Sequence, residues 1–389
     1  MLNAYKTYDE KHLDVLDGVR VLLIFIVSWY HIWQQSWLIP NFQVAGQWWS
    51  LDFIPRSGYL AVDGMLFLSG LLLLWPVLRN GGQLDVRAFY RRRLIRIVPS
   101  YVLALIASLL FTAIPEGRYT TAWDGVLDML AHLTFTHNLF YRSYMLSPLN
   151  GVLWTLGVEM QFYLIFPLLC RALRKHPLIT LLSMTGVALL YRLWAAGVED
   201  NAMLINQLPA FLDVYAWGFA AALIIHRFYR RADSFGSPEK AFFTLCMLLG
   251  AVLLIQLATA QAAENGIENI RLGQLNRRFF LAACWCVFSV GACFSLPFTR
   301  FLLGNRAMKF LASVSYQYYI WHQVFSVRIK EWGLIPSSSP EPWFAGEAAW
   351  QWPYTIACFF GTLAIATILT YGFERPVAQM LRARRDKKT

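Results

Sequence analysis

Ten apolar runs, each of roughly the length that crosses a bilayer, constrain this chain of 389 residues more than any other feature. They start near Val19, Tyr59, Ile97, Val152, Leu178, Pro209, Ala241, Phe279, Phe310 and Pro353. Hydrophobic residues make up 57% of the chain and charged residues only 15%, and the mean hydropathy of +0.44 lies outside the range of soluble globular proteins. The sequence therefore predicts an all-α integral membrane protein with about ten transmembrane helices.

Basic residues are concentrated in every second connection between the apolar runs. The connection after the second run holds Arg79, Arg87, Arg91, Arg92, Arg93 and Arg96, whereas the loop 35–57 before that run holds only Arg56. By the positive-inside rule this asymmetry predicts that both termini are cytoplasmic. Topology thus explains the net charge of +11 better than the continuous basic patch of a nucleic-acid-binding protein, and we expect no nucleic-acid partner.

The sequence shows no internal repeat, low-complexity tract or appended soluble domain, so we expect residues 1–389 to form one membrane domain. Residues 1–17 are polar, and no small-residue cleavage site follows the first apolar run. We therefore expect no cleavable signal peptide, and the first run should stay in the membrane. The six cysteines lie in or at the ends of apolar runs, where they behave as small hydrophobic residues. We predict neither a disulfide framework nor a metal site.

Two connections on the side opposite the basic loops are long, residues 115–150 and 330–352. Their Trp, Tyr, Pro and Gly residues predict ordered interfacial loops around an outward-facing site, with an amphipathic helix near Asp124 to Leu139. His132 and His137 are five residues apart, which does not align them as metal ligands on a helix. We expect both histidines at the surface, with contact to an acceptor as the alternative.

An arginine and a histidine interrupt the first apolar run. Arg20 and His31 are eleven residues apart, so on an α-helix their side chains lie within about 20° of each other and about 16 Å apart along the axis. With a cytoplasmic N-terminus, Arg20 lies near the inner interface and His31 deep in the bilayer. Ionisable residues at such depth are functional candidates. Alternatively, Arg20 snorkels to the interface and His31 hydrogen-bonds between helices.

Five ordered segments resemble motifs of the membrane acyltransferase 3 family. The stretch Leu16-Asp17-Gly18-Val19-Arg20 with His31 is similar to the family's start and its Arg-x10-His spacing, and residues 62–70 match its second-helix segment at Asp63, Ser69 and Gly70. The most specific match is residues 153–163, where Met160 replaces the second Glu of the family and leaves Glu159 as the aligned carboxylate. Residues 315–322 and Glu374-Arg375-Pro376 resemble later elements, so the resemblance spans all ten predicted helices.

The resemblance implies an integral-membrane O-acyltransferase that is acyl-CoA-dependent. It implies acyl-CoA, with acetyl-CoA expected, as donor substrate, no bound cofactor, and as acceptor a hydroxyl of a cell-surface or lipid-linked glycan at a bacterial inner membrane. The alternatives are the same chemistry on a diffusible molecule such as a macrolide, or a proton-coupled transporter, although the repeat symmetry typical of transporters is not evident. The oligomeric state is not predicted.

Arginines on the cytoplasmic side suit a polyanionic donor. Arg93 and Arg96 match an Arg-x-x-Arg element of the family, share a helix face at a spacing of three, and can bind phosphate together with Arg20. Alternatively, these arginines fix the orientation of the neighbouring helices in the membrane, and this role is compatible with phosphate binding. The resemblance adds Ser69 to the expected donor site.

His31 suits the chemistry of acyl transfer, because a neutral imidazole accepts the hydroxyl proton or carries the acyl group. Asp17, Asp63 and Glu159 are the acids that could support it, and the sequence does not select among them. Asp17 is alternatively a helix N-cap, and Glu159 alternatively forms a buried pair with an Arg or Tyr. For Arg192, within the fifth run, we expect Glu159 or an outer-loop acid as partner.

The last group of candidates lies toward the outer side. His322 falls late in an outward-running helix, with Tyr319 three residues before it on nearly the same face. We expect His322, Tyr319 and Trp154 to bind the acceptor or to stabilise the oxyanion. The alternative for this group is an interfacial aromatic belt.

Overall fold

The computed structural model describes residues 13–386 and is mostly helical. The α-helices are α1 (Val15–Ser36), α2 (Phe53–Arg56), α3 (Ala61–Arg79), α4 (Val86–Ser108), α5 (Ala122–Leu133), α6 (Tyr141–Met145), α7 (Trp154–Lys175), α8 (Pro177–Ala196), α9 (Leu212–Tyr229), α10 (Ser237–Ala262), α11 (Ile267–Phe294), α12 (Pro297–Gly304), α13 (Arg306–Glu331), α14 (Ala348–Leu369) and α15 (Arg375–Asp386). Short 3₁₀ helices are η2 (Gly58–Leu60), η4 (His137–Leu139), η5 (Gly151–Leu153), η6 (Leu204–Asn206), η7 (Leu208–Phe211) and η8 (Ala232–Ser234). Two π-helical turns, η3 (Leu109–Ala113) and η9 (Thr370–Glu374), continue α4 and α14, and β1 (Asn41–Val44) pairs with β2 (Gln47–Ser50).

Nine helices in the described part of the chain are long and apolar enough to cross a bilayer. They correspond to nine of the ten predicted runs. The remaining run, near Phe310, lies in α13, which has 26 residues but carries charged residues at both ends. Several helices also begin before the apolar run that predicts them. For example, α4 begins at Val86 because the Asp85 carboxylate caps it, accepting from the Ala88 N–H at 2.9 Å.

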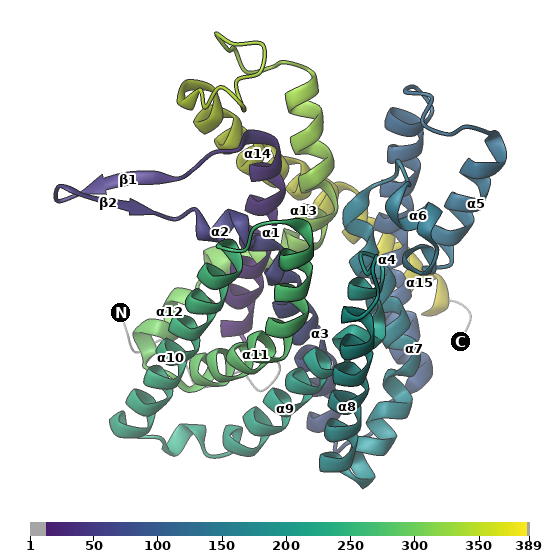
Figure 1. Cartoon of the computed structure of the whole chain (residues 1–389). Coiled ribbons are helices and arrows are strands. Elements are labelled where there is room, and N and C mark those ends of the chain that lie inside the picture. The colour runs from purple at the N-terminus through teal and green to yellow at the C-terminus, as the bar shows by residue number, and fades with distance from the viewer. Residues whose placement is uncertain (1–12, 387–389) are drawn as a thin grey trace.

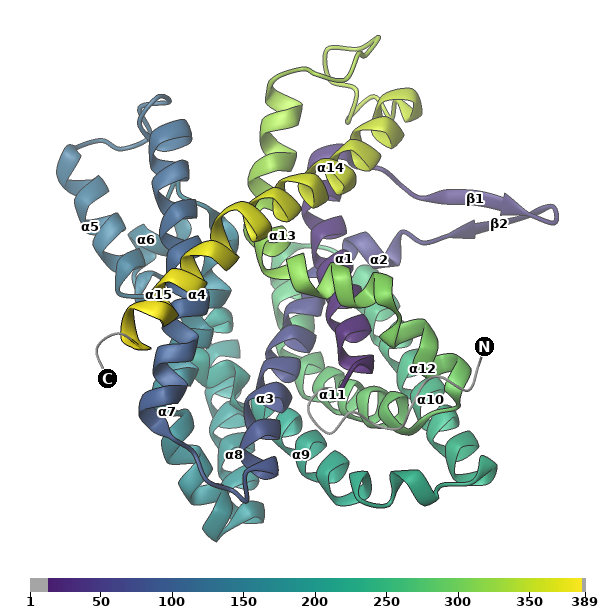
Figure 2. The ribbon, with the colours of Figure 1, turned by 180° about the vertical axis from the view of Figure 1, so that it is seen from behind.

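The helices pack in a few close pairs. Helix α3 lies along α9, α10 forms an antiparallel pair with α11, and α1 packs against α13. Figure 2 shows α14 and α15 as one long helix that crosses the back of the molecule, joined by the π-helical turn η9. This helix covers α1 and α13 from behind, and its C-terminal part contacts α4.

Small residues bring α3 and α9 together. A Cβ placed on Gly218 would collide with the backbone of Phe67 and Leu71, and one on Gly70 would touch the backbone of Tyr215. Glycine at these positions lets the two backbones approach closely, which is how helices associate when the surrounding lipid is as apolar as their side chains.

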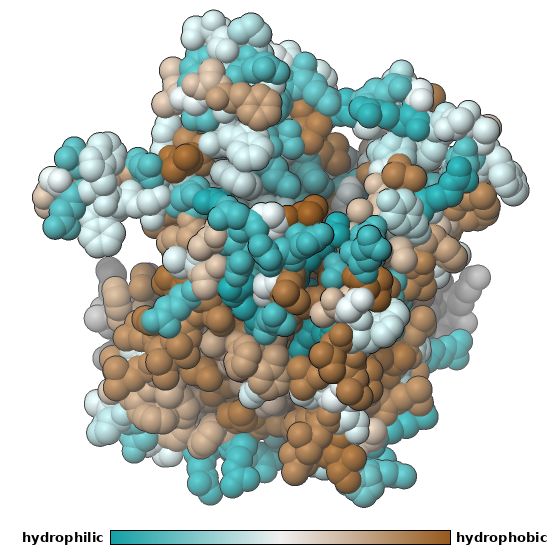
Figure 3. Space-filling model, viewed as in Figure 1, coloured by the Kyte–Doolittle hydropathy of each residue, from teal (hydrophilic) through white to brown (hydrophobic). Residues whose placement is uncertain are grey.

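Apolar side chains cover much of the outer surface of the helices. Leu190 and Leu193 of α8 and Phe360 of α14 are 68–75% exposed, and Figure 3 shows a broad hydrophobic band across the lower part of the face in view. A soluble protein would bury such a surface. A multi-pass membrane protein instead turns it toward the lipid chains.

The β1–β2 hairpin and the segment with α5, η4 and α6 lie outside the spanning helices. The β1–β2 hairpin projects from the body of the protein, and its turn residues Ala45 and Gly46 both have positive φ angles. The segment with α5, η4 and α6 forms a second projection at the same end of the molecule (Figure 1). The amphipathic helix predicted near Asp124 to Leu139 is confirmed as α5, which is shorter than predicted because it ends at Leu133.

Candidate functional site

A cavity of about 580 Å³ opens between α1, α4, α13 and α15. Its lining residues are Asp17, Arg20, Arg96, Lys309, Ala312, Ser313, Glu374, Arg375, Ala378, Gln379 and Arg382. Five of these side chains are cationic and two are carboxylates. The cavity can therefore hold a polyanion, and phosphate groups are the anions that clustered arginines bind best.

Hydrogen bonds from α13 hold the walls of this cavity in place. The Gln317 amide nitrogen donates to the Ser100 hydroxyl at 2.6 Å and to the Glu374 carboxylate at 3.0 Å. The Tyr316 hydroxyl donates to the carbonyl of Ile97 at 2.8 Å. Both residues thus tie α13 to α4, and Gln317 also reaches η9. Their roles were missed from the sequence because a partner on another helix leaves no local signal.

Two of the three arginines predicted to bind the donor line the cavity, and the third lies next to an aromatic wall. Arg20 and Arg96 are lining residues. The Arg93 guanidinium instead lies over the rings of Tyr163 and Phe89, at 5.5 and 5.8 Å from their centroids. The charge of Arg93 still acts on Arg20, as do those of Arg96, Asp17 and Glu159. The structure therefore gathers these residues at one end of α1.

The three predicted acids have different surroundings. The alternative prediction that Asp17 is the N-cap of α1 is wrong, because the helix begins at Val15. Asp17 is instead buried in the first turn and lines the cavity. Glu159 accepts from the Tyr163 hydroxyl at 3.0 Å, which is one of the pairings predicted for it. Asp63 lies in an ion pair with Arg278 at 2.9 Å rather than with His31.

Buried ion pairs account for the charges in the middle helices. Arg192 binds both carboxylate oxygens of Asp213, at 2.7 and 2.6 Å, so the prediction that it pairs with Glu159 or an outer-loop acid is wrong. Arg192 and Arg278 both donate to the carbonyl of Ala210, at 2.9 and 3.5 Å. Ser69, predicted for the donor site, is half-buried on α3 and is not a lining residue of the cavity.

The imidazole rings of His31 and His322 meet where α1 packs against α13. Their centroids are 5.1 Å apart. His31 is half-buried, and its Nδ1 bonds to Oε1 of Gln34 at 3.1 Å, while the Gln34 amide nitrogen donates to the Tyr30 hydroxyl at 2.9 Å. His322 is completely buried. The sequence placed both histidines in the site, but it gave no indication that their rings are neighbours or that Gln34 orients one of them.

The remaining candidates for the acceptor side are Tyr319 on α13 and Trp154 on α7. The Tyr319 ring lies 5.5 Å from that of His322, and its hydroxyl bonds to the Thr155 hydroxyl at 2.8 Å. Trp154 stacks on Phe211 with centroids 6.1 Å apart. In Figure 3 polar side chains gather below the recess between the lobe at the ends of α13 and α14 and the segment with α5, η4 and α6.

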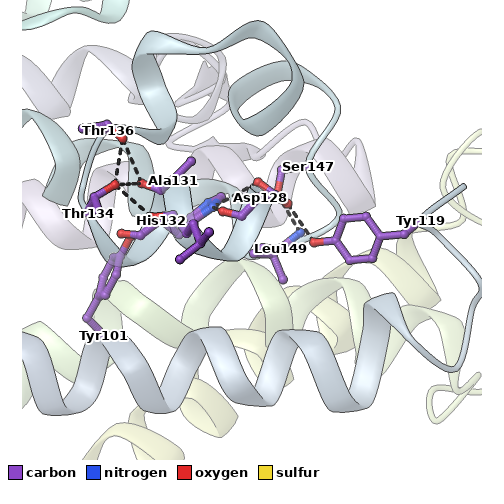
Figure 4. Close-up of polar contacts among 10 residues, drawn as sticks. Tyr101, Tyr119, Asp128, Ala131, His132, Thr134, Thr136, Ser147 and Leu149 are labelled. Carbon is purple, nitrogen blue, oxygen red and sulfur yellow. Dashed lines mark hydrogen bonds and ion pairs between the residues drawn. The ribbon is translucent and has the colours of Figure 1, made fainter. Parts of the chain in front are cut away.

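His132 and His137, expected at the surface, are buried, and that prediction is wrong. Each is 2% exposed, and their rings stack with centroids 4.1 Å apart. Figure 4 shows how His132 lies against Asp128, whose carboxylate also accepts from Tyr119 and Ser147 at 2.7 and 2.6 Å. Burial lowers the pKa of His137 to about 3. Burial acts to raise the pKa of Asp128, but its hydrogen bonds outweigh that effect and lower it.

Comparison with known proteins identifies the family. A family model described as an acyltransferase domain matches residues 13–371. The protein YrhL of Bacillus subtilis is 25% identical over 354 residues, which cover 85% of this chain and 51% of that protein. The peptidoglycan O-acetyltransferase OatA of Listeria monocytogenes is 24% identical over 330 residues, which cover 81% of this chain and 49% of that protein. The chain thus spans about half the length of both relatives, and no solved structure matches it.

Proposed function

The chain belongs to the acyltransferase 3 family of membrane O-acyltransferases, and on that premise we propose that it moves an acyl group, acetyl in the first instance, from cytoplasmic acyl-CoA to a hydroxyl group of a cell-surface or lipid-linked glycan. The observation that carries this proposal is the course of α1. One end of that helix contributes Arg20 to the cationic cavity, and eleven residues further on it presents His31.

The cavity supplies the donor site. Coenzyme A carries a diphosphate and a further phosphate at one end, and its thioester lies at the end of a long flexible arm. Arg20, Arg96 and Arg375 can hold the phosphates, because charge-assisted hydrogen bonds from guanidinium groups match phosphate oxygens. The arm then follows α1 toward His31. Basic loops on this side of the membrane support a cytoplasmic donor.

His31 supplies the reactive group. The Gln34 amide nitrogen donates to the Tyr30 hydroxyl, so the amide oxygen of Gln34 faces Nδ1 of His31. That oxygen can only accept, and Nδ1 of His31 therefore carries the proton and donates it. The neutral ring then has its lone pair on Nε2, where it can accept a proton from the acceptor hydroxyl or attack the thioester. His31 thus acts as the base or as the acyl carrier.

The acceptor is inferred from the relatives. OatA of Listeria monocytogenes is named a peptidoglycan O-acetyltransferase, and OatA of Staphylococcus aureus, 29% identical over 171 residues that cover 42% of this chain and 25% of that protein, an O-acetyltransferase. A polymeric glycan lies outside the cell, which fits an acceptor that approaches through the recess between the α13–α14 lobe and the segment with α5, η4 and α6. We therefore place the acceptor site near Tyr319 and Trp154.

An assay with labelled acetyl-CoA tests this function. Purified protein in lipid nanodiscs should release CoA and place label on soluble peptidoglycan fragments, and His31→Ala should abolish both. His226→Ala is the matched control, because His226 is also a half-buried histidine in a spanning helix but packs against Trp75. Equal turnover by wild type and His31→Ala would remove His31 from the mechanism, and transfer by neither the wild type nor the control would refute this donor and acceptor.

A further inference from the structure

His322 has the hydrogen-bond arrangement of a base, and the proposed function leaves it unused. Its Nδ1 lies 2.7 Å from the carbonyl oxygen of Tyr319. A carbonyl oxygen only accepts, so Nδ1 carries the proton and the neutral ring has its lone pair on Nε2. That Nε2 is buried and has no hydrogen-bond partner among residues 13–386. An unpaired acceptor in the interior costs free energy and calls for an explanation, and a role in catalysis is one that the neighbouring His31 ring supports.

The His31 ring lies next to the His322 ring and has the same tautomer. The two ring planes are inclined by 52° at a centroid separation of 5.1 Å. Both rings donate from Nδ1, His31 to Gln34 and His322 to the backbone of its own helix. The rings differ in accessibility, because His31 is half-buried whereas His322 is completely buried. Two imidazoles that each have a lone pair on Nε2 therefore meet, and only one of them is open to a bulky substrate.

We propose that His31 carries the acyl group and that His322 is the general base that accepts the proton of the acceptor hydroxyl. This division of labour rests on the proposed function. One histidine cannot do both tasks, because an acylated Nε2 has used the lone pair that would take up the proton. His31 suits the carrier role because α1 connects it to the donor cavity.

The reaction then has two balanced steps. In the first, Nε2 of His31 bonds to the carbonyl carbon of the thioester, the carbon–sulfur bond breaks, and the sulfur leaves with the electron pair. It takes up the proton that Nδ1 of His31 gives up, so the products are a neutral acyl-imidazole and the CoA thiol. In the second, the acceptor oxygen bonds to the acyl carbon while Nε2 of His322 accepts its proton. The bond to His31 breaks, and His322 passes the proton to the freed Nε2 of His31. Proton exchange with water moves it to Nδ1, which restores both histidines.

Replacing His322 by asparagine separates its structural contact from its chemistry. An asparagine side chain keeps an N–H group that can donate to the Tyr319 carbonyl, but it has no group that accepts a proton at neutral pH. Rapid-quench experiments with labelled acetyl-CoA and soluble peptidoglycan fragments then follow both steps. With His322→Asn we expect about one equivalent of CoA per protein, label retained on the peptide that contains His31, and transfer reduced by about 10²- to 10⁴-fold. His31→Asn should show neither CoA release nor retained label.

Ser326→Ala is the matched control, because Ser326 is also completely buried on α13 and its hydroxyl bonds only within the helix. It should transfer like the wild type. Transfer at the wild-type rate by His322→Asn would overturn the proposal. Loss of CoA release in that variant, with unchanged CoA affinity, would overturn it as well, because His322 would then act before the acyl-enzyme forms.

A second variant covers the case in which asparagine prevents folding. Free imidazole should restore transfer to His322→Ala, because the vacated space admits a proton acceptor, and lack of rescue in folded protein would count against the base. Wild-type protein that neither releases CoA nor transfers label would instead refute the proposed function, so the two failures are distinguishable.

Discussion

Arg278 donates from Nε to a carboxylate oxygen of Asp63 at 2.9 Å, and neither side chain is more than 1% exposed. This ion pair joins α11 to α3, and the Phe211 ring packs on the guanidinium at 3.9 Å. In the interior of a membrane protein such charges are kept only in pairs, because water cannot solvate a charge left alone. Asp63 thus has a structural partner that competes with any role at His31.

We predict that Asp63→Ala destabilises the protein by about 3–5 kcal/mol, because it leaves the Arg278 guanidinium buried without its counter-ion. The free energy of unfolding in detergent measures this effect. The double variant Asp63→Leu, Arg278→Leu should be more stable than the single variant, since it leaves no unpaired charge. An Asp63→Asn protein with wild-type stability but no acyl transfer would show instead that the carboxylate acts in the reaction.

The cavity predicts a graded effect of arginine substitutions on CoA affinity. Arg20→Ala and Arg96→Ala should each raise the Kd for CoA by about 10- to 100-fold, the range of one lost hydrogen bond between charged groups. Arg93→Ala should have a smaller effect, because Arg93 lies over Tyr163 and acts on the cavity only through its charge. Isothermal titration calorimetry with CoA measures the three affinities.

Arg92→Ala serves as the control for that series. Arg92 belongs to the same basic segment of α4, but it is exposed and does not line the cavity. The Kd of this variant for CoA should stay within about a factor of two of the wild-type value, as expected for a distant exposed charge. Equal losses for all four variants would mean that CoA senses only the net charge of this face.

The close contact at Gly157 predicts that the segment with α5, η4 and α6 must fit tightly against α7. A Cβ at this position would lie 3.0 Å from Cε1 of His137, so Gly157→Ala forces the histidine or its helix to move. We expect a loss of about 1–3 kcal/mol in the free energy of unfolding, typical of overpacking. His137→Ala in the same chain should recover part of the loss. Gly186→Ala on α8 is the control, because nothing lies within 4 Å of its Cβ.

The sequence could predict the parts of this molecule that depend on composition and local spacing. Apolar runs of spanning length predicted the helices, and the motifs around Arg20, His31 and Arg96 predicted residues that the structure places along α1 and its cavity. Side-chain partners on other helices could not be predicted in this way. Asp63 and Arg278 are 215 residues apart in the chain, and only the packing of α3 on α11 brings them together.

His132 and His137 show a second limit of prediction from the sequence. A spacing of five residues places His132 and His137 on different faces of a continuous helix. The helix, however, ends at Leu133, and Phe135 adopts a left-handed conformation with φ of 57°. The chain therefore reverses, and His137 stacks on His132. A single backbone conformation, which propensity alone did not indicate, turned two residues expected at the surface into a buried pair.

This pair makes the segment with α5, η4 and α6 sensitive to acid. The pKa of His137 is about 3 in the folded protein, against an ordinary value of 6.5. Between these values the unfolded segment binds a proton that the folded segment does not, so stability falls as the pH falls from 6.5 toward 3. Asp128 acts in the same direction. Its lowered pKa stabilises the fold at pH values above the ordinary pKa of an aspartate, and this stabilisation is lost as the pH falls toward the lowered pKa.

We therefore predict that the segment 121–149 loses protection from hydrogen exchange on acidification, by up to about 1.4 kcal/mol per pH unit below pH 6.5 from His137. Hydrogen exchange at pH 7.5, 6.5 and 5.5, corrected for the intrinsic exchange rate, measures this dependence peptide by peptide. His137→Phe keeps an aromatic ring on His132 but cannot be protonated, so its pH dependence should be weaker. His176→Phe, at an exposed position between α7 and α8, should leave the dependence unchanged. An equal slope in His137→Phe and the wild type would contradict the prediction, because Asp128 loses its stabilising effect only below this pH range.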